Sequence, residues 1–381
     1  MNSELENELQ ALEAYLRDES CDPDQVINFV RDTSLPFIAC DVETLGVSDA
    51  FDYSFKFLHL LGQYNLPLSV GLCMNQYIAL SIASMPTAEN TMIDMLKKQF
   101  LQQVKSNRWI LAVSSFDDFV RNKNDKGNQV YCKTQEDGSV VCNGIKNFQS
   151  NITRADLLLF TGILDEEKVG LFYTLLQGID GISFGEPMYP GAMADADTRA
   201  VEFSSLKLSP IQSIPSDTED ASAGLHALTR VVFASLAMAP YLGGARRALN
   251  EASIFLQNAH VDDKPLSELD GYIVDMGRAE IAYTCCLNSI ERFSRSLPNL
   301  SRENITAWIS EEQPKVLAQK HHVTGVCEDL VSLARKIVGT RSLLPSHIIS
   351  GLTQQIVFGA LHPEINAKIE RDFGSQALSV I

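Results

Sequence analysis

The 381-residue sequence has little positive charge for its size, and this scarcity excludes several kinds of partner. Its 31 Lys and Arg residues are outnumbered by 48 Asp and Glu residues, so the formal net charge is -17 at neutral pH. The basic residues form no long cluster. Because nucleic acids and anionic membrane surfaces bind positively charged patches, we expect neither as a partner.

Metal-site and targeting patterns are also missing. The eight cysteines include no Cys-x-x-Cys pair and no Cys/His ligand spacing, and most lie beside apolar residues, as buried free thiols do. The N-terminus, MNSELENELQ, has no basic segment followed by an apolar one. No apolar run approaches the roughly 18 residues of a membrane span. We therefore expect a soluble protein of the reducing cytoplasm, without a metal.

The spacing of apolar residues divides the chain into three predicted domains. Residues 1–107 show helical spacing and a nearly continuous apolar run at Leu66–Met85. Residues 108–215 show short alternating stretches broken by Asn-Gly, Asp-Gly and Pro-Gly, a pattern typical of β-structure. A Ser-, Pro- and acid-rich linker at Ser209–Gly224 leads into residues 216–381. This last domain contains four long helical patterns, at Leu225–Asn258, Leu266–Leu297, Thr306–Val338 and His347–Phe358.

Two stretches of the middle domain have the most specific pattern. Ser139–Phe160 (SVVCNGIKNFQSNITRADLLLF) alternates apolar and polar residues, and its Asn143-Gly144 pair predicts a turn. The apolar segment Leu157–Phe160 predicts a second strand. Met193–Pro210 (MADADTRAVEFSSLKLSP) is predicted to be another strand–turn–strand unit.

These stretches, in this order, resemble the acyl-CoA dehydrogenase family of flavin enzymes. The first is similar to the family's NG-x-K-x-(W/F)-x-(T/S)-N strand, and the second contains the Asp-Thr-Arg that precedes a later alternating strand. The resemblance covers most of the chain. It implies an α+β multidomain fold, with an N-terminal α-domain, a middle β-barrel-like domain and a C-terminal four-helix bundle.

The resemblance also implies that FAD lies against the middle domain. Phe148 would pack on the flavin ring, and the Ser150 hydroxyl would bond to the N5 atom that receives hydride. Ser114 ends the strand within Trp109–Ser115 and would be a further flavin contact. The cofactor-binding residues implied in this way are Val113, Ser114, Phe148, Gln149, Ser150 and Asn366.

The family's phosphate-binding features are replaced in this sequence. Ser115–Arg121 (SFDDFVR) has no glycine where the family has a Gly-Ser-Asp turn. His260–Leu269 (HVDDKPLSEL) has Val-Asp-Asp where the family has an arginine for the pyrophosphate. Val338-Gly339-Thr340 replaces a Gly-Gly-x-Gly near the adenosine. FAD is the expected cofactor, with FMN or loss of the flavin as alternatives.

The last segment of the chain contains the predicted catalytic base. Glu364–Arg371 (EINAKIER) aligns with the family's E-G-T-S-x-I-x-R, so that Glu364 takes the position of the base and Asn366 that of a flavin-contacting Thr. A carboxylate suits removal of the α-proton of an acyl thioester while hydride passes to the flavin. Pro363 is predicted to begin the last helix, since proline is tolerated in a first helical turn.

A second base position used by some members falls at Thr229, which is not a carboxylate. His226 lies one turn earlier and is a possible substitute. His362 supports a different enzyme class, because Leu361-His362-Pro363 resembles a Leu-His-Asp-Pro stretch of flavin monooxygenases with this fold. Asp197-Thr198-Arg199 and Glu364 favour the dehydrogenase. A flavin-poor partner subunit is a third hypothesis.

The predicted substrate is an acyl thioester carried by coenzyme A or by an acyl carrier protein. Both carriers are anionic, so binding either requires a local basic patch in this acidic chain. Candidates for such a patch are Arg246-Arg247, Arg335-Lys336 and Arg341. The apolar stretches Val231–Leu242 and Ile281–Leu287 need covering, which predicts a homodimer or homotetramer.

Overall fold

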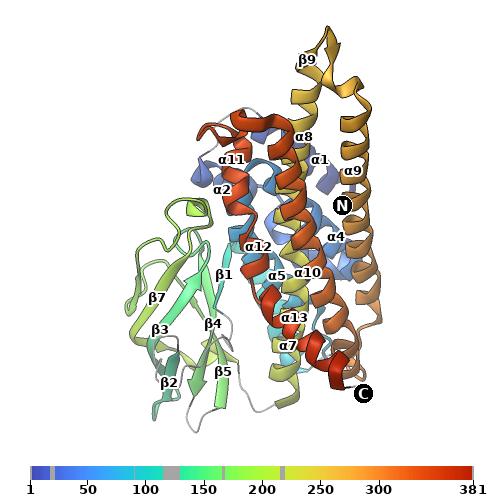
Figure 1. The fold of residues 1–381 in the computed structure, drawn as a ribbon. Coiled ribbons are helices and arrows are strands. Elements are labelled where there is room, and N and C mark those ends of the chain that lie inside the picture. The colour runs from blue at the N-terminus through green and yellow to red at the C-terminus, as the bar shows by residue number, and fades with distance from the viewer. Residues whose placement is uncertain are drawn as a thin grey trace.

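The computed structural model describes residues 2–17, 22–89, 91–114, 129–164, 168–214 and 219–379. Helices form both ends of the chain, and a mixed sheet lies between them in sequence (Figure 1). Figure 1 shows the long C-terminal helices side by side, with the sheet against one side of the helical part. This is the predicted helical, β and helical order.

The N-terminal helices begin at residues that suit helix starts. The side chain of Asp22 accepts a hydrogen bond from the backbone N–H of Asp24, and Asn65 and Thr91 cap later helices in the same way. Pro residues follow the caps at positions 23 and 67, within the first helical turn. The elements are α1 (Asn2–Arg17), α2 (Pro23–Arg31), the 3₁₀ segment Leu35–Asp41, α3 (Val42–Leu45), α4 (Val47–Tyr64), α5 (Leu66–Ser84) and α6 (Met92–Asn107).

The middle sheet has the strand order β6-β7-β3-β2-β4-β5-β8, with β1 paired to β4. Strand β4 pairs in parallel with β1 and β2, and the remaining pairs are antiparallel. The strands are β1 (Leu111–Ser114), β2 (Val130–Thr134), β3 (Val140–Gln149), β4 (Leu157–Leu164), β5 (Lys168–Leu175), β6 (Ile182–Phe184), β7 (Arg199–Leu208) and β8 (Ser213–Ile214).

The C-terminal region is built from long helices. Pro240 lacks a backbone N–H, and the predicted helix Leu225–Asn258 is broken into two at Ala237, one turn before it. The predicted helix Thr306–Val338 is α10, almost residue for residue. The elements are α7 (Glu219–Leu236), α8 (Met238–Asn258), β9 (His260–Val261), β10 (Lys264–Pro265), α9 (Asp270–Ser296), α10 (Ile305–Val338), α11 (Ile348–Gln355), α12 (Phe358–Leu361) and α13 (Asn366–Ser379).

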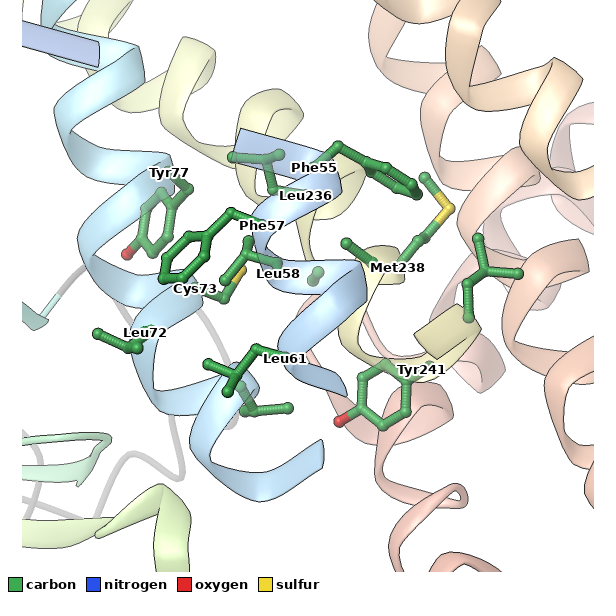
Figure 2. Packing of buried hydrophobic residues seen from close by; sticks show 14 of the residues in the cluster. Phe55, Phe57, Leu58, Leu61, Leu72, Cys73, Tyr77, Leu236, Met238 and Tyr241 are labelled. Atoms are coloured by element: carbon green, nitrogen blue, oxygen red, sulfur yellow. The ribbon is translucent and has the colours of Figure 1, made fainter. Parts of the chain in front are cut away.

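Helices from the two ends of the chain share one hydrophobic core. Figure 2 shows Phe57 of α4 and Tyr77 of α5 packed close to Leu236 of α7, with Met238 and Tyr241 of α8 nearby. Helix α8 packs against both α4 and α10. The N-terminal helices therefore depend on the C-terminal helices for much of their buried surface.

Glycines allow α4 and α8 to approach closely. A Cβ atom added at Gly243 of α8 would lie 2.2 Å from the backbone oxygen of His59 on α4. One added at Gly62 of α4 would lie 2.5 Å from the backbone oxygen of Pro240. Contacts this short with backbone atoms are not tolerated, so both positions require glycine.

One local prediction, the turn at Asn143-Gly144, is wrong for an identifiable structural reason. Asn143-Gly144 is not a turn but lies inside β3, where β7 has one extra residue opposite it. The Asn143 side chain accepts a 2.8 Å hydrogen bond from the backbone N–H of Ser205, which has a positive φ. A Cβ atom at Gly144 would lie 2.0 Å from the backbone oxygen of Gln129, which precedes β2, so the glycine allows the close pairing of β3 with β2.

Three further segment predictions also differ from the structure. Met193–Pro210 is not strand–turn–strand, because its first part is a short 3₁₀ turn, Ala194–Ala196, before the single strand β7. The predicted linker Ser209–Gly224 contains the short strand β8 and the first turns of α7. Glu364 precedes the last helix, which starts at Asn366 rather than at Pro363.

Two segments are long and apolar enough to span a membrane, although the sequence interpretation found none. They are Leu66–Ser84 and Gly224–Asn258, and 94% and 72% of their most apolar windows are buried inside the protein. Both contribute to the shared helical core. Their apolar composition is explained by that burial.

Candidate functional site

A β-bulge at the end of β3 turns an aromatic ring out of the sheet. The β3–β7 register runs from Lys146 opposite Val201 to Gln149 opposite Arg199, so β3 has one extra residue in this interval. Within it Phe148 has φ of +64°, an uncommon backbone angle for a bulky residue, and its side chain is 60% exposed. A large exposed ring held by an unusual backbone is typical of a binding site.

Next to this ring, two hydroxyl groups form a buried pair. Ser150 Oγ lies 2.9 Å from Thr198 Oγ1, and both residues are less than 10% exposed. Asp197 fixes this arrangement. It accepts hydrogen bonds from the backbone N–H of Thr153 at 2.7 Å and from the Thr153 hydroxyl at 2.6 Å, and its other oxygen pairs with Arg199 at 2.6 Å. The Asp-Thr-Arg motif is therefore a clamp that joins the turn after Ser150 to the start of β7.

Buried polar atoms at the ends of β1 and β3 have no protein partner among the described residues. They are Ser114 Oγ, Gln149 Oε1 and both side-chain polar atoms of Asn151. Strands β1 and β3 are in contact, and Val113 beside Ser114 is also buried. Leaving such a group unsatisfied costs about 1–3 kcal/mol. These atoms therefore fit a site that offers hydrogen bonds to a polar, flat ligand.

The turn between α12 and α13 is held by one buried lysine. Lys320 of α10 donates hydrogen bonds to the backbone oxygens of His362 and Glu364, at 3.0 and 2.8 Å, and to Asn366 Oδ1 at 3.1 Å. Asn366 in turn donates to Thr324 Oγ1 at 2.9 Å. Burial lowers the pKa of Lys320 to about 8, and the nearby Glu364 charge opposes that shift.

Glu364 is buried and paired with two cations. Arg230 of α7 donates to its Oε1 atom, and Lys368 Nζ lies 2.8 Å from its Oε2 atom. The carboxylate is only 5% exposed. Its charge is thus compensated on both oxygens, although only Oε1 accepts a hydrogen bond from the described residues. Arg230 lies directly after Thr229, the vacant second base position of the sequence interpretation.

The two histidine candidates lie in different environments. His362 packs against the rings of Phe233 and Tyr241, at centroid distances of 6.1 and 5.6 Å, and is half-buried. Burial, with a smaller contribution from the Lys320 charge, lowers its pKa to about 3, so its imidazole is neutral at working pH. His226 is partly exposed on α7, and its backbone oxygen accepts a 2.6 Å hydrogen bond from Thr229.

An aromatic contact connects the strand-end segment to the C-terminal turn. Tyr189 lies in the loop between β6 and β7. The backbone N–H of the preceding residue, Met188, donates a 2.9 Å hydrogen bond to the backbone oxygen of Thr198. The Tyr189 ring meets Phe358 of α12 edge-on, with centroids 5.1 Å apart. The clamp around Ser150 and the turn that contains Glu364 are therefore linked through one loop.

The predicted phosphate-side segments have structural explanations. Asp262 and Asp263 both have positive φ and form the two-residue turn of the β9–β10 hairpin. Figure 1 shows this hairpin beyond the upper ends of α8 and α9. Gly339, with φ of +71°, ends α10. The segment Ser115–Arg121 lies outside the described residues.

Sequence reasoning missed the partners that orient the candidate residues. Lys368 stands four residues after Glu364, a helical spacing at which an ion pair could have been expected. Arg230 and Lys320 come from distant helices, and nothing in the local sequence connects them with Glu364.

Comparisons with known proteins identify the fold. No protein-family model and no curated protein matches the chain. Among solved structures, butyryl-CoA dehydrogenase from Megasphaera elsdenii is 15% identical, covers 98% of both chains and has a TM-score of 0.80. The dibenzothiophene monooxygenase TdsC from Paenibacillus sp. A11-2, with FMN bound, is 16% identical and has a TM-score of 0.81. The matched region covers 100% of this chain and 97% of the TdsC chain. The chain therefore has the acyl-CoA dehydrogenase fold.

Proposed function

We propose that this protein is a flavin-dependent oxidoreductase with the flavin ring against Phe148. The observation that carries this proposal is the β-bulge that exposes Phe148 next to the buried Ser150–Thr198 hydroxyl pair. Ser114 Oγ and Gln149 Oε1, which have no hydrogen-bond partner in the described part of the chain, are the further atoms that would hold the ring. A bound flavin would supply two-electron redox chemistry that the protein's side chains do not provide.

Flavin binding can be tested at the ring and at its edge. Phe148→Ala removes packing area as well as a ring contact, whereas Ser150→Ala removes about one hydrogen bond, on the order of 1 kcal/mol or fivefold in Kd. We expect Phe148→Ala to weaken flavin binding more, as measured by fluorescence titration of the apoprotein. Phe184→Ala, a partly exposed ring on β6, is the matched control. Equal affinity of the Phe148→Ala variant and the original protein would contradict this placement.

FAD is the first candidate for the flavin and FMN the second. The Asp262-Asp263 turn places two carboxylates in the segment that the resemblance assigns to the pyrophosphate, which disfavours tight diphosphate binding there. Release of the cofactor by heat, followed by chromatography against both standards, distinguishes the two. Purified protein that binds neither flavin would support the partner-subunit hypothesis instead.

The first candidate reaction is dehydrogenation of an acyl thioester, with Glu364 as the base. Arg230 and Lys368 fix the carboxylate, and Lys320 fixes the backbone on both sides of it. A carboxylate has about four lone-pair sites, so two ion pairs leave capacity to accept a proton. Glu364 would take the α-proton of the substrate, and Ser150 would help to hold the flavin that accepts the hydride.

Monooxygenation is the second candidate, and the environment of Glu364 is the observation that favours it. A carboxylate that is 5% exposed and charge-compensated by two cations also has the properties of a purely structural group. His362, a neutral imidazole two residues before Glu364, would then be the functional side chain. Its role would be to donate or accept one proton near the oxygenated substrate.

Two substitutions separate these candidates. Glu364→Gln is nearly isosteric, so a dehydrogenase should keep its flavin but lose anaerobic flavin reduction by acyl thioesters by about 10²-fold or more. His362→Asn should then have the smaller effect. For a monooxygenase the order reverses, and turnover consumes oxygen and reduced flavin. Glu370→Gln, which changes an exposed carboxylate in α13, the helix that follows Glu364, is the matched control. Wild-type flavin reduction in Glu364→Gln contradicts the dehydrogenase.

The proposed substrate holds its acyl group on a thiol-bearing carrier. Coenzyme A and an acyl carrier protein both remain candidates, and each brings phosphate groups to an acidic protein. Calorimetric titration with the same acyl group on each carrier decides between them. Binding of neither carrier would contradict the thioester substrate.

We also propose that the protein assembles as a homodimer or homotetramer. Val231–Leu242, one of the two stretches that led to this prediction, is covered within the chain itself. The remaining support comes from α9, where Ile273, Val274 and Ile281 are 53%, 48% and 67% exposed. A monomer by light scattering at micromolar concentration would contradict this proposal.

A further inference from the structure

The hairpin of β2 and β3 places two buried cysteines directly opposite each other. Cys132 of β2 pairs with Cys142 of β3, and their Sγ atoms are 3.0 Å apart. The two residues are 4% and 0% exposed. Neither belongs to the candidate site, and neither was given a function by the sequence pattern.

The hydrogen-bond register makes this pair suitable for a covalent link. The backbone N–H of Gln135 donates a 2.8 Å hydrogen bond to the backbone oxygen of Ser139. The backbone N–H of Ile145 donates a 3.2 Å hydrogen bond to the backbone oxygen of Gln129. Hydrogen-bonded and non-hydrogen-bonded pairs alternate along an antiparallel ladder, so Cys132 and Cys142 form a non-hydrogen-bonded pair. The Cα atoms of such pairs are about 4.5 Å apart, within the range that a disulfide spans.

A glycine on the neighbouring strand leaves room for one of the sulfurs. A Cβ atom added at Gly162 of β4 would lie 2.5 Å from Cys132 Sγ. The Cys132 side chain therefore occupies the space above this glycine. Because Cys132 is enclosed by β3 and β4, its sulfur has little freedom to move away from Cys142.

We propose that Cys132 and Cys142 form a cross-strand disulfide when the protein is exposed to hydrogen peroxide. Peroxide oxidises one thiol to a sulfenic acid and releases one water. The sulfur of the second cysteine then attacks the sulfenic sulfur, and the S–S bond forms with release of a second water. Two thiols thus lose two electrons and two protons in total, and one peroxide is reduced to two waters.

This link is independent of the proposed flavin chemistry. It would join β2 to β3 within the sheet core, upstream of Phe148 on the same strand. Its formation depends only on the pairing of the hairpin and on the entry of a small oxidant. The site is therefore an oxidative modification site of the middle sheet.

The test uses the full-length native protein. It is incubated with hydrogen peroxide, treated with catalase, denatured with N-ethylmaleimide to block the remaining thiols, and digested with trypsin without reduction. Because Lys133 lies between the two cysteines, trypsin separates them into peptides 127–133 and 134–146. We expect a linked species of these two peptides, lighter than their sum by about 2 Da for the two lost hydrogens, together with loss of both N-ethylmaleimide adducts.

Three controls keep the result interpretable. Cys132→Ala must abolish the linked species, while Cys73→Ala, which removes an equally buried thiol from α5, must leave it unchanged. The exposed Cys285 reports whether the oxidant acted. If Cys285 is oxidised while Cys132 and Cys142 both still react with N-ethylmaleimide as in untreated protein, the proposal is wrong.

Discussion

The helical part and the sheet of this protein bury their apolar residues in different ways. The helical core joins residues from both ends of the chain, from Leu5 in α1 to Ile356 after α11. The sheet core is smaller and lies between Ala112 and Leu208, in one continuous part of the sequence. The helical part is therefore a product of long-range packing, whereas the sheet is a more local unit.

The two cores share strands, and this shows how the sheet is attached. In β4, Leu157 and Leu159 belong to the helical core, whereas Leu158 and Phe160 belong to the sheet core. Successive side chains of a strand point to opposite faces, so one strand serves both cores. A parallel strand buried on both faces has a continuous apolar sequence, which explains the run Leu157–Phe160.

Truncation of one large ring in each core gives the largest expected effect. Phe57→Ala and Phe160→Ala each remove a fully buried ring and should cost about 3–5 kcal/mol in the free energy of unfolding. In hydrogen exchange, we expect Phe57→Ala to reduce protection in α4 and also in α8. Phe160→Ala should reduce protection in the strands around it. Loss of protection in both regions with either variant would show that the cores unfold as one unit.

Filling the close approach of α4 and α8 should be the next most damaging change. Gly243→Ala puts a methyl group against the backbone of His59, and we expect a loss of about 3 kcal/mol, the upper end for over-packing. Gly277→Ala on α9 has no atom within 4 Å of the added group and is the control. It should stabilise by about 0.5 kcal/mol, because alanine favours the helix. Urea unfolding measures both, and equal midpoints would contradict the tight helix contact.

A smaller effect is expected from pH, and one part of it acts through the helical core. Burial, with the nearby Arg246 charge, lowers the pKa of His59 to about 4 from an ordinary value of 6.5. The unfolded chain binds this proton at a higher pH than the folded protein does. The contribution of His59 therefore lowers the free energy of unfolding as the pH falls below about 6.5. Between pH 7 and pH 5 this loss is about 2 kcal/mol.

The His59→Gln variant should lose this part of the pH dependence, because glutamine can still bond to Tyr283 but does not titrate. Urea midpoints at pH 7 and pH 5 measure it. His260→Gln, on the exposed β9 strand, should leave the dependence unchanged. An unchanged slope in His59→Gln would mean that other groups control acid sensitivity.

Most of the fold was predictable, because its periodicity is local. Helix α10 and the alternating strand β7 follow directly from apolar spacing. The turn predicted at Asn143-Gly144 was wrong because this residue pair is compatible both with a hairpin turn and with a strand that lies opposite a bulge. Only the pairing with β7 distinguishes the two structures. The sharing of one core by the first and last helices is likewise a tertiary property.

The candidate site was predictable in part. The sequence singled out Phe148 and Ser150, and the structure explains their geometry through a bulge that no sequence motif specifies. Whether they bind a flavin stays a prediction. The environment of Glu364 was not foreseeable, because Arg230 and Lys320 reach it from helices that are distant in sequence.

The buried Lys320 gives the C-terminal turn a chemical reporter. A lysine with a pKa near 8 has a substantial fraction of neutral, nucleophilic amine at physiological pH, and burial is the main reason for that value. The Lys320 side chain is only 1% exposed, however, so an acylating reagent reaches it only when the segment around Glu364 moves away from α10. The rate of Lys320 acylation, relative to that of the exposed Lys207, therefore measures how often this segment opens in solution.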